Sequence, residues 1–211
     1  MAMELKQIIK QNPVMAIMRN VPWEDTLPYG EAVLKGGVRV FEVALNSASG
    51  LEQICLLKKE LGREAVIGAG TAVTVELVKK AVEAGADFLL TPNTDERILE
   101  YCAGEKLSLM PGVMTPSEVG LCLRYGYHLL KLFPAGELPL SYVKTIKGPF
   151  DNTDYLAIGG VRYGNWREFI QHGFLGVGLG SSLFPKELVK SRDWDAMRKF
   201  VEEQYSANPP A

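Results

Sequence analysis

The chain has 211 residues, of which 47% are hydrophobic, and a formal net charge of -2, which is enough apolar material for a sizeable core. Positive and negative residues are interspersed without the basic stripe that nucleic acid or an anionic membrane would require, and no apolar stretch approaches the roughly 20 residues of a membrane span. Because the opening MAMELK also lacks the basic-then-apolar pattern of a signal peptide, we expect a cytoplasmic protein with neither nucleic acid nor a membrane as partner.

The cysteines and histidines do not suggest a metal site. Cys55, Cys102 and Cys122 are odd in number and far apart, and each lies in a stretch of helical periodicity, so we expect reduced core residues. His128 and His172 have no metal-ligand spacing relative to any cysteine. The sequence therefore predicts no metal.

After a short helix expected near Glu4 to Lys10, a short apolar strand, a polar turn and a helix alternate along the whole chain. The expected strands are Val14 to Arg19, Val38 to Leu45, Ala65 to Gly70, Phe88 to Pro92, Leu107 to Gly112, His128 to Pro134, Tyr155 to Gly160 and Phe174 to Gly180. The expected helices are Glu24 to Lys35, Leu51 to Leu61, Val75 to Ala84, Asp95 to Ala103, Pro116 to Tyr125, Pro139 to Ile146, Asn165 to His172 and Trp194 to Tyr205. Left-handed helix C-caps are expected at Gly36-Gly37, Gly85, Gly104, Gly126 and Gly173.

Eight strand-helix units without an interrupting Pro/Ser-rich linker predict one α/β domain over residues 1 to 211. The pattern is that of a TIM (β/α)8 barrel at the short end of its length range. A doubly wound open sheet is the alternative, but no G-x-G-x-x-G follows the first expected strand.

Lys131 is the first candidate for chemistry, because it lies within the apolar stretch HLLKLFPA, residues 128 to 135. A strand of a parallel sheet is covered on both faces, and burial lowers a lysine's pKa by favouring the neutral amine. A neutral amine is the nucleophile that forms a Schiff base with a ketone. The alternative is a lysine that reaches water at the strand end or pairs with a carboxylate.

The expected strands end in polar or glycine-rich segments, as function in a TIM barrel requires. Strand alternation places Glu42 on one face with Val40 and Ala44, and Lys131 on one face with Leu129 and Phe133. If both faces point inward, an amine and a carboxylate meet inside the barrel. The segments at the strand ends are Arg19, Asn46-Ser47, Gly70-Thr71, Thr91-Pro92-Asn93, Pro111-Gly112, Gly159-Gly160 and Gly180-Ser181-Ser182.

Two of these features have plainer interpretations. Arg19 and Glu42 could form a structural ion pair. Gly159-Gly160 and Gly180-Ser181 could be tight turns, but they follow the seventh and eighth strands, where backbone N–H groups commonly hold phosphate.

Together these residues resemble the 2-keto-3-deoxy-6-phosphogluconate/4-hydroxy-2-oxoglutarate aldolase family over nearly the whole chain. The motifs that carry the resemblance are AIMR (16 to 19), FEVAL (41 to 45), IGAGT (67 to 71), MPGVMTPSE (110 to 118), LKLFPA (130 to 135) and IGGV (158 to 161). The resemblance implies a class I aldolase, a TIM barrel that assembles as a homotrimer and needs no cofactor.

The resemblance also implies roles for individual residues. It makes Lys131 the Schiff-base lysine and Glu42 the acid/base. It assigns Arg19 and Thr71 to the pyruvoyl end of the substrate. Asn46, Pro92 and Phe133 are expected to contact substrate, and Gly159, Gly160, Gly180 and Ser181 to hold its phosphate.

Two departures from the family pattern concern the substrate. Asn46 stands where many members have arginine, and Ile158 where they have threonine. The variants LNS (45 to 47), TPN (91 to 93) and GLGS (178 to 181) look more like the branch that acts on 2-keto-3-deoxy-6-phosphogalactonate.

The expected activity is cleavage of 2-keto-3-deoxy-6-phosphogluconate to pyruvate and glyceraldehyde 3-phosphate, with 4-hydroxy-2-oxoglutarate as a further candidate substrate. Cleavage of the phosphogalactonate epimer is the alternative. An isomerase or synthase of phosphorylated metabolites on the same barrel, and a non-catalytic phosphosugar-binding barrel, are the rival functions.

Overall fold

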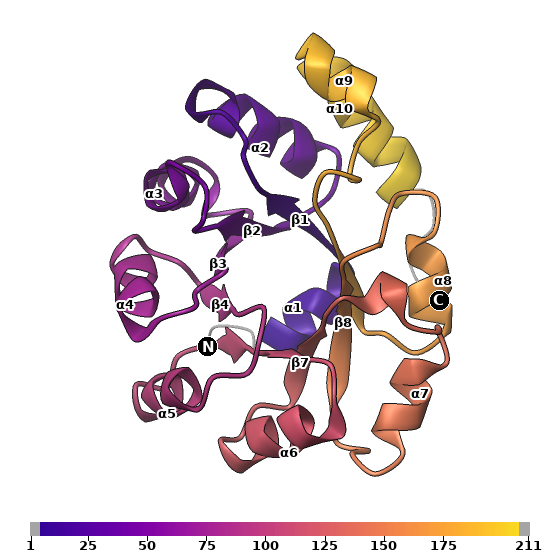
Figure 1. The fold of residues 1–211 in the computed structure, drawn as a ribbon. Coiled ribbons are helices and arrows are strands. Elements are labelled where there is room, and N and C mark those ends of the chain that lie inside the picture. The colour runs from indigo at the N-terminus through magenta and orange to yellow at the C-terminus, as the bar shows by residue number, and fades with distance from the viewer. Residues whose placement is uncertain (1–4, 207–211) are drawn as a thin grey trace.

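The apolar strands of the sequence form one parallel barrel in the computed structural model, which describes residues 5–206 (Figure 1). Strands run in parallel pairs around it in the order β5-β4-β3-β2-β1-β9-β8-β7-β6. The strands are β1 (Val14–Met18), β2 (Val40–Ala44), β3 (Val66–Gly70), β4 (Phe88–Leu90), β5 (Leu109–Met110), β6 (Gly112–Val113), β7 (Leu129–Leu132), β8 (Asp154–Ile158) and β9 (Gly176–Leu179). This arrangement confirms the predicted TIM-barrel class.

The fifth expected strand is divided in two, which is why nine strand segments occupy eight barrel positions. Pro111 separates β5 from β6 and has no N–H to give to a ladder. Its carbonyl accepts a hydrogen bond from the backbone N–H of Lys131 at 2.9 Å, so Pro111 itself helps to join β7 to β5 and β6.

Helices surround the strands, each packing its apolar side inward, and α1 crosses the barrel on its axis (Figure 1). The α-helices are α1 (Leu5–Gln11), α2 (Thr26–Lys35), α3 (Gly50–Leu61), α4 (Val75–Glu83), α5 (Glu96–Gly104), α6 (Pro116–Arg124), α7 (Tyr142–Lys147), α8 (Trp166–Gln171), α9 (Lys186–Ser191) and α10 (Trp194–Val201). Short 3-10 turns η1 (Trp23–Asp25) and η2 (Ala135–Glu137) and a π-helical turn η3 (Glu202–Ser206) complete the set. None of the helices between residues 5 and 206 is long and apolar enough to cross a membrane.

Several local expectations need correction. Helix α9 and turn η2 were not predicted, and Glu4, the first residue expected in α1, lies outside the described residues. Gly104 is the last residue of α5, and the left-handed residue there is Lys106, with φ 56°. Cys55 is exposed because it lies on the outer side of α3, whereas Cys102 and Cys122 are buried; all three are free thiols.

The core has two layers. One lies between the strands and the surrounding helices, and the other fills the barrel interior. Ile9 of α1 is 1% exposed and belongs to the interior layer together with Met15, Phe88 and Leu156. Helix α1 therefore closes the end of the barrel opposite the strands' carboxyl ends.

Candidate active site

Lys131 lies in the middle of β7 with its side chain inside the barrel and only 3% of the residue exposed. Its neighbours Leu130 and Leu132 pack in the outer core, whereas Leu129 packs with the interior cluster, as alternation along a strand requires. The Nζ lies 5.3 Å from the ring centroid of Phe133. The strand pattern therefore puts a lone amine among apolar side chains.

The surroundings of Lys131 favour the neutral amine. Burial is the main cause that lowers the pKa of Lys131 below its ordinary value. The carboxylate of Glu42 acts in the opposite direction, and the guanidinium of Arg19 lowers the pKa further. These three side chains come from β7, β2 and the end of β1, so the barrel brings them into one electrostatic environment.

Glu42 is fully buried in β2, and neither oxygen of its carboxylate has a hydrogen-bond partner. Phe41 and Val43 belong to the outer core, so Glu42 points inward. A buried polar group without a partner costs about 1–3 kcal/mol, and such groups are typical of catalytic sites. Among the described residues Arg19 forms no ion pair, so the structural Arg19–Glu42 pair considered above is not present.

Gly70 provides the space for the Glu42 carboxylate. A Cβ at Gly70 would overlap Glu42 Oε1 and lie 2.6 Å from its Cγ. Gly68, two residues earlier on the same face of β3, makes room in the same way for the ring of Phe88. The role of Gly70 was not predicted, although the alternating glycines of Ile-Gly-Ala-Gly indicate a strand face with room for a facing side chain.

Arg19 and Thr71 follow directly after β1 and β3. Arg19 is exposed at the barrel mouth, and Thr71 is half-buried with φ 60°. A β-branched residue in the left-handed region costs about 1–3 kcal/mol, which the surrounding structure must offset. Backbone strain of this kind clusters at functional sites, so Thr71 is held in a specific orientation at the mouth.

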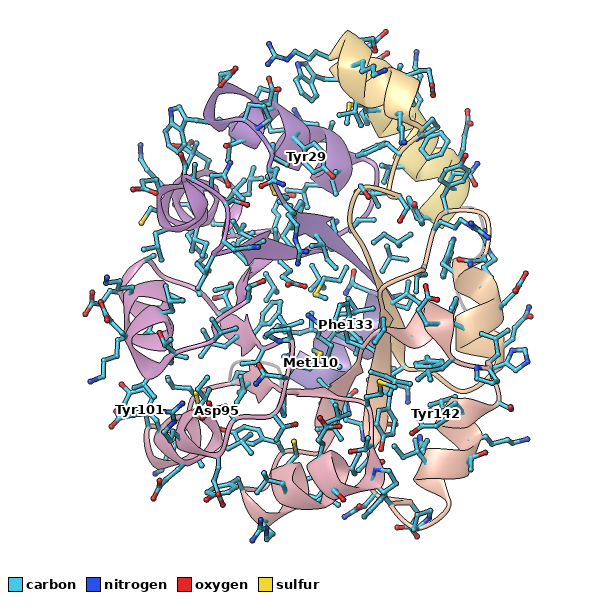
Figure 2. The ribbon with its side chains drawn as sticks, viewed as in Figure 1. Tyr29, Asp95, Tyr101, Met110, Phe133 and Tyr142 are labelled. Carbon is cyan, nitrogen blue, oxygen red and sulfur yellow. The ribbon has the colours of Figure 1, made fainter. Side chains whose placement is uncertain are left out.

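Asn46, Pro92 and Phe133 also lie at this end of the barrel. Asn46 is exposed in the turn after β2, next to Ser47, whose Oγ accepts the Asn20 N–H at 3.0 Å. Pro92 is half-buried after β4, and Phe133 is 38% exposed after β7; Figure 2 shows Phe133 within the ring of strands.

A cavity of about 400 Å³ brings the glycine loops together with Arg19 and Phe133. The φ angles of Gly159 and Gly160 are 86° and 77°, which side chains rarely adopt. Among the loop hydrogen bonds of the described residues, none uses the N–H of Gly160 or Ser181 as donor. The cavity is lined by Ile17, Arg19, Asn20, Phe133, Ile158, Gly159, Gly160, Val161, Gly178, Gly180, Ser181 and Ser182.

Of the lining residues, Asn20 was not predicted, whereas Ser182 was expected at the end of the last strand and Val161 belongs to the IGGV motif. Asn20 carries no chemical signal in the sequence, and the Ser182 hydroxyl already donates a hydrogen bond to the Val161 carbonyl at 2.6 Å. In the stretch from residue 5 to residue 206, no three His, Cys, Asp or Glu side chains gather as metal ligands. The donors of the lining residues include the Arg19 guanidinium and backbone N–H groups, which suit an organic or phosphate anion.

Comparison with known proteins identifies the family. Residues 5–200 match the family model described as KDPG and KHG aldolase. The KHG/KDPG aldolase of Escherichia coli (strain K12) is 31% identical over 200 residues, which cover 94% of this chain and 93% of the relative.

Solved structures agree with this relationship. A KDPG aldolase from Legionella pneumophila, with pyruvate captured as a covalent carbinolamine intermediate, has a TM-score of 0.87 and 28% identity and covers 97% of this chain and 100% of its own. A structure described as "Native KDPGal structure" has a TM-score of 0.82 and 28% identity, with coverage of 92% and 94%. The chain therefore belongs to the KDPG and KHG aldolase family, whose members are carbon–carbon lyases.

Proposed function

We propose that the protein is a class I aldolase that cleaves 2-keto-3-deoxy-6-phosphogluconate to pyruvate and D-glyceraldehyde 3-phosphate. The observation that carries this proposal is the buried Lys131 amine, whose pKa is lowered by burial, in the same barrel interior as the unpartnered Glu42 carboxylate. The related aldolases that share the fold support it.

In the proposed first stage, Lys131 attacks the C2 ketone of the substrate. The neutral amine adds to the carbonyl to give a carbinolamine, which loses water to give a protonated imine. The relative from Legionella pneumophila, which holds pyruvate as a carbinolamine, supports this step. Arg19 and Thr71, at the mouth above Lys131, are proposed to bind the carboxylate next to the ketone.

In the second stage the C3–C4 bond breaks. Glu42, directly or through a water, removes the C4 hydroxyl proton, and the C3–C4 electron pair moves into the imine to give an enamine. The aldehyde leaves, the enamine is protonated at C3, and hydrolysis releases pyruvate and the free amine. The imine is the electron sink, so the mechanism needs no cofactor.

The distal half of the substrate is proposed to occupy the cavity of about 400 Å³. The free N–H groups of Gly160 and Ser181 would receive the phosphate together with Gly159 and Gly180, and Phe133 and Pro92 would border the sugar chain. We also propose the homotrimer that the family resemblance implies. Sedimentation analysis would test it.

Borohydride trapping tests the Schiff base. Reduction in the presence of pyruvate should attach a three-carbon adduct to the protein, and peptide mass mapping should place it on Lys131. Lys131→Met should give neither adduct nor cleavage, whereas Lys144→Gln, on the outer helix α7, should give both. An adduct on another lysine, or undiminished cleavage by Lys131→Met, would show the assignment to be wrong.

A second candidate substrate is the galactonate epimer, and two observations favour its use. Ile158 is 5% exposed and lines the cavity with an apolar side chain, and Asn46 is exposed at the mouth with both a donor and an acceptor. We propose that both epimers are cleaved, with kcat/KM values within about 10²-fold, a gap that one hydroxyl contact can supply. Unphosphorylated 2-keto-3-deoxygluconate should be cleaved poorly.

Parallel assays of the two phosphorylated epimers, the unphosphorylated acid and 4-hydroxy-2-oxoglutarate decide the substrate. Release of glyoxylate from 4-hydroxy-2-oxoglutarate would add that acid to the substrates. Strict use of one epimer would contradict the role given to Asn46, and equal rates with and without phosphate would contradict the amide site.

A further inference from the structure

A second cavity, of about 310 Å³, lies beside the cavity that contains the glycine loops. The two share Ile17, Arg19, Asn20, Gly180 and Ser181, so the ends of β1 and β9 border both. A group bound at Gly180-Ser181 is therefore accessible from the second cavity as well as from the first.

The inner side of the second cavity is apolar and well packed. Tyr29, labelled on α2 in Figure 2, and Phe184 both line it, and their rings meet edge to face with centroids 5.6 Å apart. Both residues are buried, at 6% and 3% exposure. This wall excludes water from one side of any ion that enters.

The outer side of the same cavity has one carboxylate, which is paired, and two lysine ammonium groups, which are not paired with any described residue. Its carboxylate, Asp25, is paired with Arg192 at 3.0 Å, and Arg192 also contacts Glu24 at 3.1 Å. Lys186 and Lys190 of α9 line the cavity, and neither forms an ion pair or side-chain hydrogen bond with another described residue. The cavity thus has two free ammonium groups and a neutralised carboxylate.

We propose that Lys186 and Lys190 supply the positive charge for the substrate phosphate and so determine selectivity for phosphorylated substrates. This inference rests on the proposed function. The cations that line the two cavities are Arg19, Lys186 and Lys190, and Arg19 is proposed to hold the carboxylate at the other end of the substrate. Asn46, exposed after β2, is neutral. Backbone N–H groups orient a phosphate, and lysine adds a point charge.

Removing both charges while keeping similar side-chain length tests the proposal. In Lys186→Gln/Lys190→Gln, kcat/KM for the phosphorylated substrate should fall about 10- to 100-fold, because one charged contact is worth about a factor of ten and two are worth about a factor of one hundred. Exchange of the pyruvate methyl protons, which involves no phosphate, should change less than about 2-fold. Lys10→Gln/Lys144→Gln is the matched control for net charge, since these lysines lie on α1 and α7, and it should leave both rates unchanged.

Binding of sn-glycerol 3-phosphate, measured by calorimetry, keeps the test independent of turnover. The double variant should bind it about 10-fold more weakly or worse, and Lys186→Arg/Lys190→Arg should restore binding. Unchanged binding and unchanged kcat/KM in the glutamine double variant would overturn the proposal. Absence of pyruvate exchange and of borohydride trapping in the unmodified protein would instead refute the proposed function, and the calorimetric result would still decide the role of the two lysines.

Discussion

Adding one methyl group at Gly70 should lower kcat by displacing the Glu42 carboxylate, whereas a methyl group elsewhere on the same strand should lower mainly the stability of the barrel. An alanine Cβ there would lie 2.6 Å from Glu42 Cγ and would overlap its carboxylate. Since carbon atoms prefer separations of about 3.5–4.0 Å, the Glu42 side chain must move by about 1 Å. A displacement of that size in a reacting group can cost about 10²-fold, so we expect kcat of Gly70→Ala to fall by about that factor.

Gly68→Ala is the matched control on the same strand face. Its Cβ would lie 2.7 Å from Cδ2 of the Phe88 ring, which is 1% exposed in the interior layer. Overpacking of this kind costs about 1–3 kcal/mol, so Tm should fall by about 2 to 12 °C in a chain of this size. The Glu42 carboxylate is not displaced, and kcat of the folded protein should stay within about 3-fold.

The two variants are compared by coupling pyruvate release to a lactate dehydrogenase assay and by thermal denaturation. The expected result is a large loss of kcat in Gly70→Ala, and a loss mainly of stability in Gly68→Ala. If Gly70→Ala retained kcat within about 2-fold, the position of the Glu42 carboxylate would not limit the reaction, and the acid/base role would be refuted.

Three further predictions concern the same site. Glu42→Gln keeps the side-chain volume but removes the proton acceptor, so kcat should fall roughly 10²- to 10⁴-fold in the coupled assay while KM changes little; a change confined to KM would make Glu42 a binding residue. Arg19→Met removes a charge that lowers the pKa of Lys131, so the pH below which imine formation fails should rise. Glu42→Gln removes a charge that raises the pKa of Lys131, so that pH should fall. Borohydride trapping across the pH range measures both shifts, and equal shifts in one direction would contradict the assignment. A chelator should leave the cleavage rate unchanged, and inhibition by EDTA that a divalent metal reverses would place the protein in the metal-dependent class.

Most of the barrel could be predicted because its strands are short apolar runs separated by helices of clear periodicity. The strand bounds were overestimated by one or two residues at some ends, since apolar turn residues such as Val38 and Phe174 continue the pattern without joining the ladder. The division at Pro111 could have been predicted, because a proline inside an expected strand removes a ladder donor. Helix α9 is as short as α7 and α8, which were predicted, but none of its six residues is buried, so it lacks the apolar face that marks the other two in the sequence.

The site was partly predictable for a different reason. Alternation along a strand is sufficient to place Lys131 and Glu42 on interior faces once the barrel is assumed, and the glycine loops follow from their position after the last two strands. Lys186 and Lys190 could not be assigned from sequence, because exposed lysines on a short helix are common. What distinguishes them is that they line one cavity together with the residues at the ends of β1 and β9.

The closure of the barrel by α1 has a kinetic consequence for the proposed reaction. With Ile9 and the interior apolar layer on one side of Lys131, substrates and products must exchange through the mouth past Phe133. In the proposed reaction the three-carbon fragment would be held on Lys131, deeper in the barrel than the aldehyde, so we expect the aldehyde to depart first. We therefore expect ordered release, with aldehyde first and pyruvate last. Pyruvate should accordingly be a competitive product inhibitor of cleavage, and glyceraldehyde 3-phosphate a noncompetitive one.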